Sequence, residues 1–279
     1  SAAYFLKKQG FTNIQIFEKN PQVGGKCISK TVDGKSFDIG ANYVPSSYKI
    51  VRKLARELGA KLYTEGPVQS YDHRLREFRS VFRAVLSETT FFRLFWHSLK
   101  YMWLRWRLNK VISSKTPGYA GIADSYPELC QPFETWLEDN NMADLSLLFE
   151  APVTLMGYSQ LTKIPTAYVL TYLPVATFCE VIGASISTRI LGYPKRFIDG
   201  FQRFFEKLSW TLETEAIHFN TRVTKVTRDE TIQVDYISYD PDSGKEIAGS
   251  AGFDFLFVGA PLHSSSLHFM DFEPSEKAL

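Results

Sequence analysis

The sequence has 279 residues, 44% hydrophobic and 15% aromatic, a composition typical of a globular chain that buries a large core. Its formal net charge of +2, without a long block of one sign, argues against a nucleic-acid partner. The three cysteines, Cys27, Cys130 and Cys179, lack metal-ligand spacing, which argues against a zinc site and against a disulfide-based scaffold.

The first 45 residues carry the pattern of a nucleotide-binding unit. A helix precedes a short strand over 13–18, which ends in the acid Glu18 and is followed by the pair Gly24 and Gly25. In a dinucleotide-binding βαβ unit, an acidic residue at the tip of the second strand hydrogen-bonds the adenosine ribose. We therefore predict a fragment of a nucleotide-cofactor enzyme, with the first strand and its Gly-rich turn lying before Ser1.

Beyond this unit the hydrophobic periodicity changes twice, first to helices and then back to strands. In chain order it predicts a strand at 37–40, a helix over 48–59, a strand at 61–63, helices over 91–106, 132–140, 143–150, 165–178 and 195–212, and strands over 217–219, 222–228, 231–239 and 253–258. A chain that leaves a Rossmann-like sheet and returns to it builds a second, discontinuous domain. We therefore predict an α/β fold with domain bounds at 1–70, 71–194 and 195–279.

Five segments carry a resemblance to a known family: 16–18, 23–27, 37–41, 219–226 and 255–261. They resemble the flavin-containing amine oxidoreductase superfamily. The resemblance implies a Rossmann-like FAD-binding domain formed by 1–70 and 195–279, a mainly helical substrate domain over 71–194, and FAD as the cofactor.

Within that superfamily, further segments are most similar to the polyenoic fatty acid isomerase type: 44–46, 76–78, 132–133, 157–158 and 164–173. This resemblance implies an FAD-dependent oxidoreductase that abstracts hydride from a hydrophobic small-molecule substrate. With a polyunsaturated fatty acid, return of the hydride at another carbon would move a double bond. No general base stands out, and we expect the fragment alone to be inactive.

Seven residues are predicted to contact FAD: Glu18, Gly24, Gly25, Lys26, Gly40, Ala41 and Val223. The Glu18 carboxylate can accept from both ribose hydroxyls, and glycine lets the backbone approach a cofactor without a Cβ in the way. Lys26 stands where the superfamily usually has arginine, so it keeps the charge but loses the bidentate fork. The plain alternatives are a solvated acid, a solvated lysine, ordinary turns and a valine in a strand core.

Four residues are predicted to contact the substrate: Arg76, Tyr158, Tyr168 and Tyr172. An arginine can bind a fatty-acid carboxylate through two hydrogen bonds, and tyrosines can line an apolar channel. The alternatives are a solvated arginine and tyrosines that belong to the core.

Residues 91–106 combine an apolar face rich in phenylalanine and tryptophan with a basic face, as interfacial membrane helices do. Many globular helices share that pattern, and no run of about 18 uncharged apolar residues predicts a membrane span. A peripheral membrane contact through 91–106 is therefore left open. Two other functions also stay open: a flavin amine oxidase or polyene desaturase, and a non-catalytic lipid- or membrane-binding flavoprotein.

Overall fold

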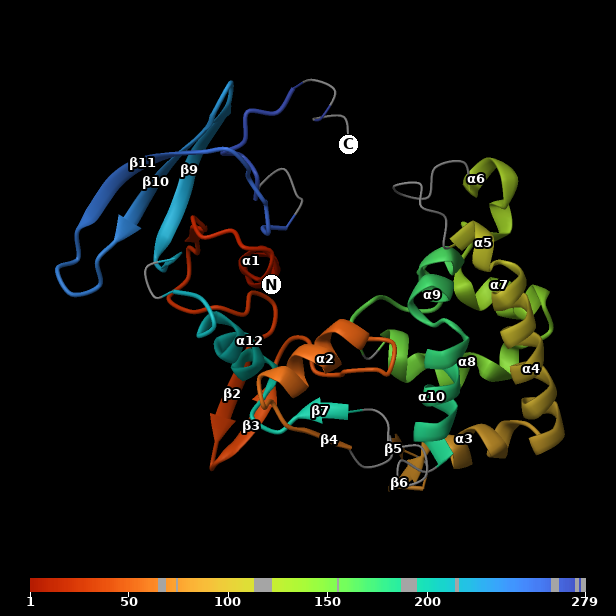
Figure 1. Cartoon of the computed structure of the whole chain (residues 1–279). Helices are drawn as coiled ribbons and strands as arrows, with labels where there is room; N and C mark the ends of the chain where they lie inside the picture. The colour runs from red at the N-terminus through yellow and green to blue at the C-terminus, as the bar shows by residue number, and fades with distance from the viewer. Residues whose placement is uncertain are drawn as a thin grey trace. The chain divides into compact units, whose positions relative to one another are not determined.

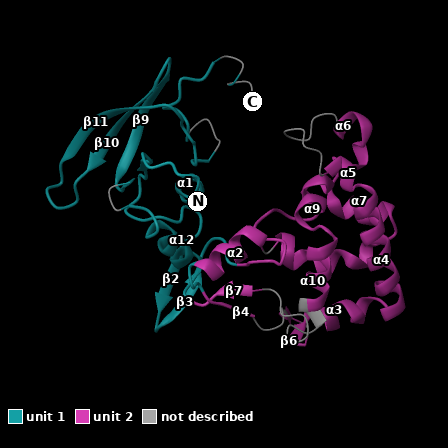
Figure 2. Ribbon diagram, in the orientation of Figure 1, with its two compact units in different colours: residues 1–42, 58–60, 199–279 teal, residues 43–57, 61–198 magenta. Residues whose placement is uncertain are grey.

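Figure 1 shows the computed structural model, which describes residues 1–64, 69–73, 75–112, 122–154, 156–186, 195–213, 216–261, 266–273 and 276. The chain forms two compact units, coloured separately in Figure 2. Unit 1 contains residues 1–42, 58–60 and 199–279, and unit 2 contains residues 43–57 and 61–198. Unit 1 therefore contains the N-terminal and C-terminal segments of the chain, while unit 2 is built mainly from the middle of the chain.

Unit 1 is built around short sheets. Its elements are α1 (Ala2–Lys8), β1 (Ile16–Phe17), β2 (Ser29–Val32), β3 (Lys35–Asp38), α12 (Phe201–Ser209), β8 (Ile217–His218), β9 (Thr221–Arg228), β10 (Ile232–Tyr239) and β11 (Glu246–Phe253). Strands β1 and β8 pair in parallel, β2 and β3 form an antiparallel hairpin, and β9, β10 and β11 form an antiparallel sheet in the order β11-β10-β9.

The antiparallel sheet confirms two predicted strands and adds a third. Val226 on β9 and Val234 on β10 lie opposite each other, and both are buried. Strand β11 has little β-propensity because it contains two glycines and two alanines. One of those glycines is needed for space: Gly249 lies opposite Tyr236, and a Cβ on Gly249 would lie only 2.5 Å from the Tyr236 ring.

The prediction of a buried strand over 253–258 is wrong. Strand β11 ends at Phe253, and the side chains of Phe255 and Phe257 are 86% and 74% exposed. An apolar run becomes a buried strand only where a neighbouring strand supplies ladder hydrogen bonds and a packing surface. Within the described residues, segment 254–258 has no such strand beside it.

Unit 2 is mainly helical. Its elements are α2 (Lys49–Glu57), β4 (Leu62–Thr64), β5 (Gln69–Asp72), β6 (Glu77–Ser80), α3 (Val81–Glu88), α4 (Phe91–Arg107), α5 (Asn109–Ile112), α6 (Ile122–Ser125), η1 (Pro127–Leu129), α7 (Phe133–Asp139), η2 (Ala143–Leu145), α8 (Ser146–Phe149), the π-helical turn η3 (Glu150–Thr154), α9 (Thr166–Tyr172), α10 (Val175–Ile186) and β7 (Lys195–Phe197). Strand β4 pairs with β7, and β5 pairs with β6.

Aromatic side chains from four helices meet at the centre of the unit 2 core. The ring centroids of Tyr101 and Phe178 lie 4.3 Å apart, and those of Phe133 and Phe149 lie 4.8 Å apart. All four residues are fully buried. This cluster anchors α4, α7, α8 and α10 to one another.

Two predicted helices differ from the observed elements. The helix expected over 165–178 is broken, since α9 ends before Pro174 and α10 begins after it, with a bend of 76°. The helix expected over 195–212 begins only at Phe201, because residues 195–197 form β7 and Gly200 adopts a φ of +84°.

No single described helix is long and apolar enough to cross a membrane, although the bent α9–α10 pair together has the required length and composition.

Candidate functional site

A tight turn follows the glycine pair in unit 1. Gly24 and Gly25 have φ values of +123° and +55°, which glycine adopts without steric cost. The N–H of Cys27 donates to the backbone oxygen of Gly24 over 2.9 Å, and a Cβ on Gly24 would lie 2.8 Å from the backbone oxygen of Cys27. The turn therefore depends on glycine at position 24 for space as well as for backbone conformation.

The end of β3 runs beside this turn. A Cβ on Gly40 would lie only 1.8 Å from the backbone oxygen of Lys26, and the N–H of Ala41 donates to that same oxygen over 3.4 Å. The tertiary structure thus brings Lys26, Gly40 and Ala41 together, although Gly40 and Ala41 follow Lys26 by 14 and 15 positions in the sequence. These three predicted cofactor residues share one surface with the glycine turn.

Asp38, which the sequence pattern does not mark as a site residue, fastens this surface to the start of α12. Its Oδ1 accepts from the N–H of Phe201 over 2.8 Å and from the hydroxyl of Ser29 over 2.6 Å. The N–H of Gln202 donates to Ser29 Oγ, and the Ser29 N–H donates to Gln202 Oε1. Two side chains of the β2–β3 hairpin therefore cap the helix N-terminus. Nothing local in the sequence pairs Asp38 with a helix 163 residues away.

Glu18 lies directly after β1, as predicted. Its N–H donates to the backbone oxygen of His218, and its backbone oxygen accepts from the N–H of Thr221 over 2.9 Å. The carboxylate Oε1 accepts from the N–H of Asn20 over 2.9 Å. The acid is thereby held by its backbone at the point where β1, β8 and β9 meet.

Val223 lies two residues beyond Thr221 on the outer strand of the antiparallel sheet. The register shifts beside it, because Tyr236 opposes Val223 while Asp235 opposes Lys225, leaving Thr224 as the bulged residue. Since backbone groups alternate in direction along an antiparallel strand, the N–H and C=O of Val223 point to the same edge as those of Thr221. The Thr221 N–H at that edge donates to the backbone oxygen of Glu18, so the Val223 backbone points to the edge of β9 that Glu18 contacts.

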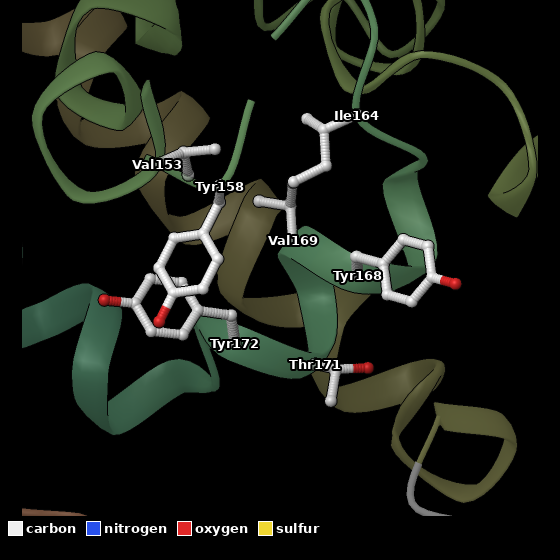
Figure 3. A pocket seen from close by; sticks show the side chains of 7 residues that line it. All are labelled: Val153, Tyr158, Ile164, Tyr168, Val169, Thr171 and Tyr172. Carbon is white, nitrogen blue, oxygen red and sulfur yellow. The ribbon is translucent and has the colours of Figure 1, made fainter. Parts of the chain in front are cut away.

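Unit 2 contains an open cavity of about 280 Å³ that brings together the three predicted tyrosines, of which Tyr158 and Tyr168 are half exposed (Figure 3). It is lined by Val153, Tyr158, Ile164, Tyr168, Val169, Thr171 and Tyr172. The aromatic centroids of Tyr158 and Tyr172 lie 4.5 Å apart, whereas Tyr168 extends on the other side of Val169. None of the described side chains that line this cavity carries a charge.

The surroundings of this cavity raise the pKa of the Tyr172 phenol. Burial raises the pKa of the Tyr172 phenol, and the nearby hydroxyls of Tyr158 and Tyr48 raise it further. The phenol therefore stays protonated at physiological pH and remains a hydrogen-bond donor.

A partly buried carboxyl lies on α10, the helix that follows α9. Glu180 Oε2 accepts from the N–H of Ser46 over 3.1 Å, while Oε1 is buried and has no hydrogen-bond partner among the described residues. Burial raises the pKa of this carboxyl, against a smaller lowering by the Ser46 hydrogen bond and by Arg52. The sequence pattern does not single out Glu180, because its surroundings come from residues far away in the chain.

Arg76 is not among the residues that line the cavity. It lies in the turn of the β5–β6 hairpin, has a φ of +53°, and is exposed. A positive φ is unusual for a residue with a Cβ and stores backbone strain. The structure therefore places the predicted carboxylate ligand on a strained, accessible turn of the same unit.

Residues 1–277 match the family described as flavin containing amine oxidoreductase. The chain belongs to this family. It has the family's mixed helical and strand fold, with a Rossmann-like FAD-binding part and a discontinuous helical/β part, and its cofactor is FAD. No curated protein matches the sequence.

Several solved structures share the fold at low sequence identity. A CLA-producing fatty acid isomerase from P. acnes is 24% identical with a TM-score of 0.71, over 99% of this chain and 59% of that chain. A putrescine oxidase bound to putrescine is 20% identical with a TM-score of 0.58, over 84% and 51% of the two chains. A cyclohexylamine oxidase from Brevibacterium oxydans is 15% identical with a TM-score of 0.56, over 90% and 53%. The chain thus spans little more than half the length of these relatives.

The unit 1 residues fit an FAD molecule. A Cβ on Gly24 or Gly40 would meet a backbone oxygen of the chain itself, whereas a Cβ on Gly25 would meet nothing within 4 Å, so the backbone at Gly25 is open to a cofactor. Glu18 supplies a carboxylate at the end of β1, and Lys26 supplies a cation at the glycine turn. A carboxylate can accept from ribose hydroxyls, and a cation beside an open glycine backbone can bind phosphate.

Proposed function

We propose that the protein takes hydride from a hydrophobic substrate and that this substrate is a polyunsaturated fatty acid whose double bond is moved. The observation that carries the proposal is the cavity of unit 2, whose described lining is aliphatic and aromatic apart from Thr171 and carries no charge. A hydrocarbon chain gains free energy in such a lining, at about 25 cal/mol for each Å² of apolar surface removed from water. FAD, when bound, supplies the hydride-accepting chemistry.

In this proposal, seven unit 1 residues hold the cofactor. Glu18 accepts from the ribose hydroxyls, and the Val223 backbone meets the adenine. The Gly24–Gly25 turn and Lys26 lie against the phosphates, and Gly40 with Ala41 lies near the flavin ring. Lysine neutralises phosphate as a point charge, without the two-pronged contact of arginine.

The substrate residues have separate tasks. Tyr158, Tyr168 and Tyr172 line the apolar pocket with their rings. Arg76 binds the fatty-acid carboxylate through its guanidinium. Isomerisation leaves substrate and product with the same formula, so the protein need only hold the chain, keep water out and present the correct carbons.

Amine oxidation is the second candidate, and one observation favours it. The tilted pair of Tyr158 and Tyr172 rings could hold an ammonium group over an aromatic face. The uncharged lining of the cavity favours the fatty acid instead, because no carboxylate among the described lining residues would balance an amine.

An anaerobic titration of the full-length flavoprotein with linoleic acid tests the proposal. Appearance of a conjugated-diene absorbance without oxygen uptake is the expected result. Peroxide release in an aerobic assay with putrescine or another amine, together with an unchanged flavin spectrum with fatty acid, would replace isomerisation by amine oxidation. Failure of FAD to copurify would contradict the assignment of the unit 1 residues.

A further inference from the structure

Helix α4 has an unusual distribution of polar and apolar side chains. The face that meets the unit 2 core contains Leu94, Tyr101 and Leu104, but also Ser98 and Arg105. The Tyr101 hydroxyl donates to the backbone oxygen of Leu173, and Arg105 Nε donates to that of Leu170. Polar side chains on the inward face are thus satisfied, and they anchor the helix firmly to the unit.

The most apolar part of α4 faces outward. Phe92, Trp106 and Trp96 are 83%, 70% and 67% exposed. The other large exposed apolar side chains on the helix are Phe91, Phe95, Leu99 and Trp103. At 100° per residue, these residues span a continuous arc of about 140° next to the buried face. In Figure 2, α4 runs along the outer side of unit 2.

A basic rim borders the apolar arc. Arg93, Lys100 and Arg107 follow one another along its edge, and Lys110 lies just beyond the helix. Arg107 covers the Trp103 ring at 5.2 Å, while Arg93 lies 3.6 Å from Asp144. No aspartate or glutamate occurs in the sequence from 89 to 123. The acidic and basic side chains that α4 itself carries are therefore all basic, and Asp144 from η2 pairs with Arg93 and His97.

We propose that the exposed face of α4 lies on the surface of an anionic phospholipid bilayer. An exposed contiguous patch of this kind marks an interaction site. Tryptophan prefers the boundary between head groups and acyl chains, and a lysine- and arginine-rich rim complements anionic head groups. A helix that carries both lies in the plane of the interface.

The charge pattern favours a lipid surface over a second copy of this chain. A second copy of the chain would bring a like-charged rim against this one, which costs binding free energy. A bilayer offers negative charge around an apolar interior, which matches both the rim and the arc. The proposal does not depend on the reaction catalysed, because membrane binding is measured without turnover.

Co-sedimentation of the full-length flavoprotein with vesicles tests the proposal. We expect binding to vesicles of phosphatidylglycerol and phosphatidylcholine, and much weaker binding to phosphatidylcholine alone. Replacing Phe92, Trp96 and Trp106 together by serine should weaken partitioning on the order of 100-fold. Arg107→Glu with Lys110→Glu should weaken it about tenfold and remove the preference for anionic lipid.

A matched control changes exposed apolar residues of the other unit. Trp210→Ser with Ile247→Ser removes side chains of comparable exposure and should leave vesicle binding unchanged. A second readout needs no variant: vesicles containing brominated lipid should quench the tryptophan fluorescence of the unmodified protein. Equal binding of the α4 and control variants, or no quenching, would overturn the proposal. Light scattering that shows a dimer lost in the α4 triple variant would assign this face to a second copy instead.

Discussion

Gly40 and Lys26 are in backbone contact: a Cβ at position 40 would lie 1.8 Å from the backbone oxygen of Lys26. Glycine is therefore required here by a close approach of two chain segments rather than by a positive φ. The same contact draws the end of β3 onto the glycine turn, and it builds the surface that we assign to FAD.

Gly40→Ala should lower the free energy of unfolding by about 3 kcal/mol, because the added carbon forces the two segments apart. It should also weaken FAD binding. Urea unfolding and flavin titration measure the two effects. Gly259→Ala is the control, since a Cβ there meets nothing within 4 Å, and it should be close to neutral. Equal stability of the Gly40→Ala protein and the parent would contradict the observed contact.

Glu18→Gln should raise the dissociation constant for FAD by roughly 10- to 100-fold, because a charged acceptor of ribose hydroxyls is lost. The stability of the apoprotein should change little, since an amide oxygen can still accept from the N–H of Asn20. Flavin fluorescence titration measures the affinity. Glu213→Gln, another charge-removing change in unit 1, should leave it unchanged. An unaltered affinity in the Glu18→Gln protein would exclude the ribose contact.

Arg76→Gly should have two separate effects, one on stability through backbone strain and one on KM through substrate binding. Removing the Cβ from a residue at φ +53° should stabilise the protein by about 1 kcal/mol. If the guanidinium binds the fatty-acid carboxylate, KM for linoleate should rise about tenfold or more with kcat little changed. Arg76→Lys keeps the charge and should give an intermediate KM. Should all three proteins share one KM, the carboxylate is bound elsewhere.

Glu180 should make stability depend on pH. Burial raises the pKa of its carboxyl above the ordinary value of 4.5, so the folded state holds the proton more tightly than the unfolded state. Its contribution to stability is therefore present below pH 4.5 and is lost as pH rises through the raised pKa. Urea unfolding across this range should show the parent losing stability relative to Glu180→Gln. Parallel pH profiles would show that the carboxyl is not desolvated.

Much of unit 1 could be predicted from local pattern. The strand that ends at Glu18, the glycine pair and the β9 and β10 strands all follow from residues close together in the chain, and the structure contains each of them. The strand expected over 253–258 does not form, because strand formation there depends on a distant neighbour and not on local pattern. Its apolar run specifies a surface to be buried but does not supply the neighbour that would bury it.

On α4, local periodicity predicts the helix and its division into apolar and basic residues. Which side is buried depends on the fold, because the core offers backbone oxygens at Leu170 and Leu173 to which Arg105 and Tyr101 donate. Periodicity records which residues share a face. Whether that face meets the core, a cofactor or a bilayer depends on the groups that distant segments bring to it, and those are set by the fold as a whole.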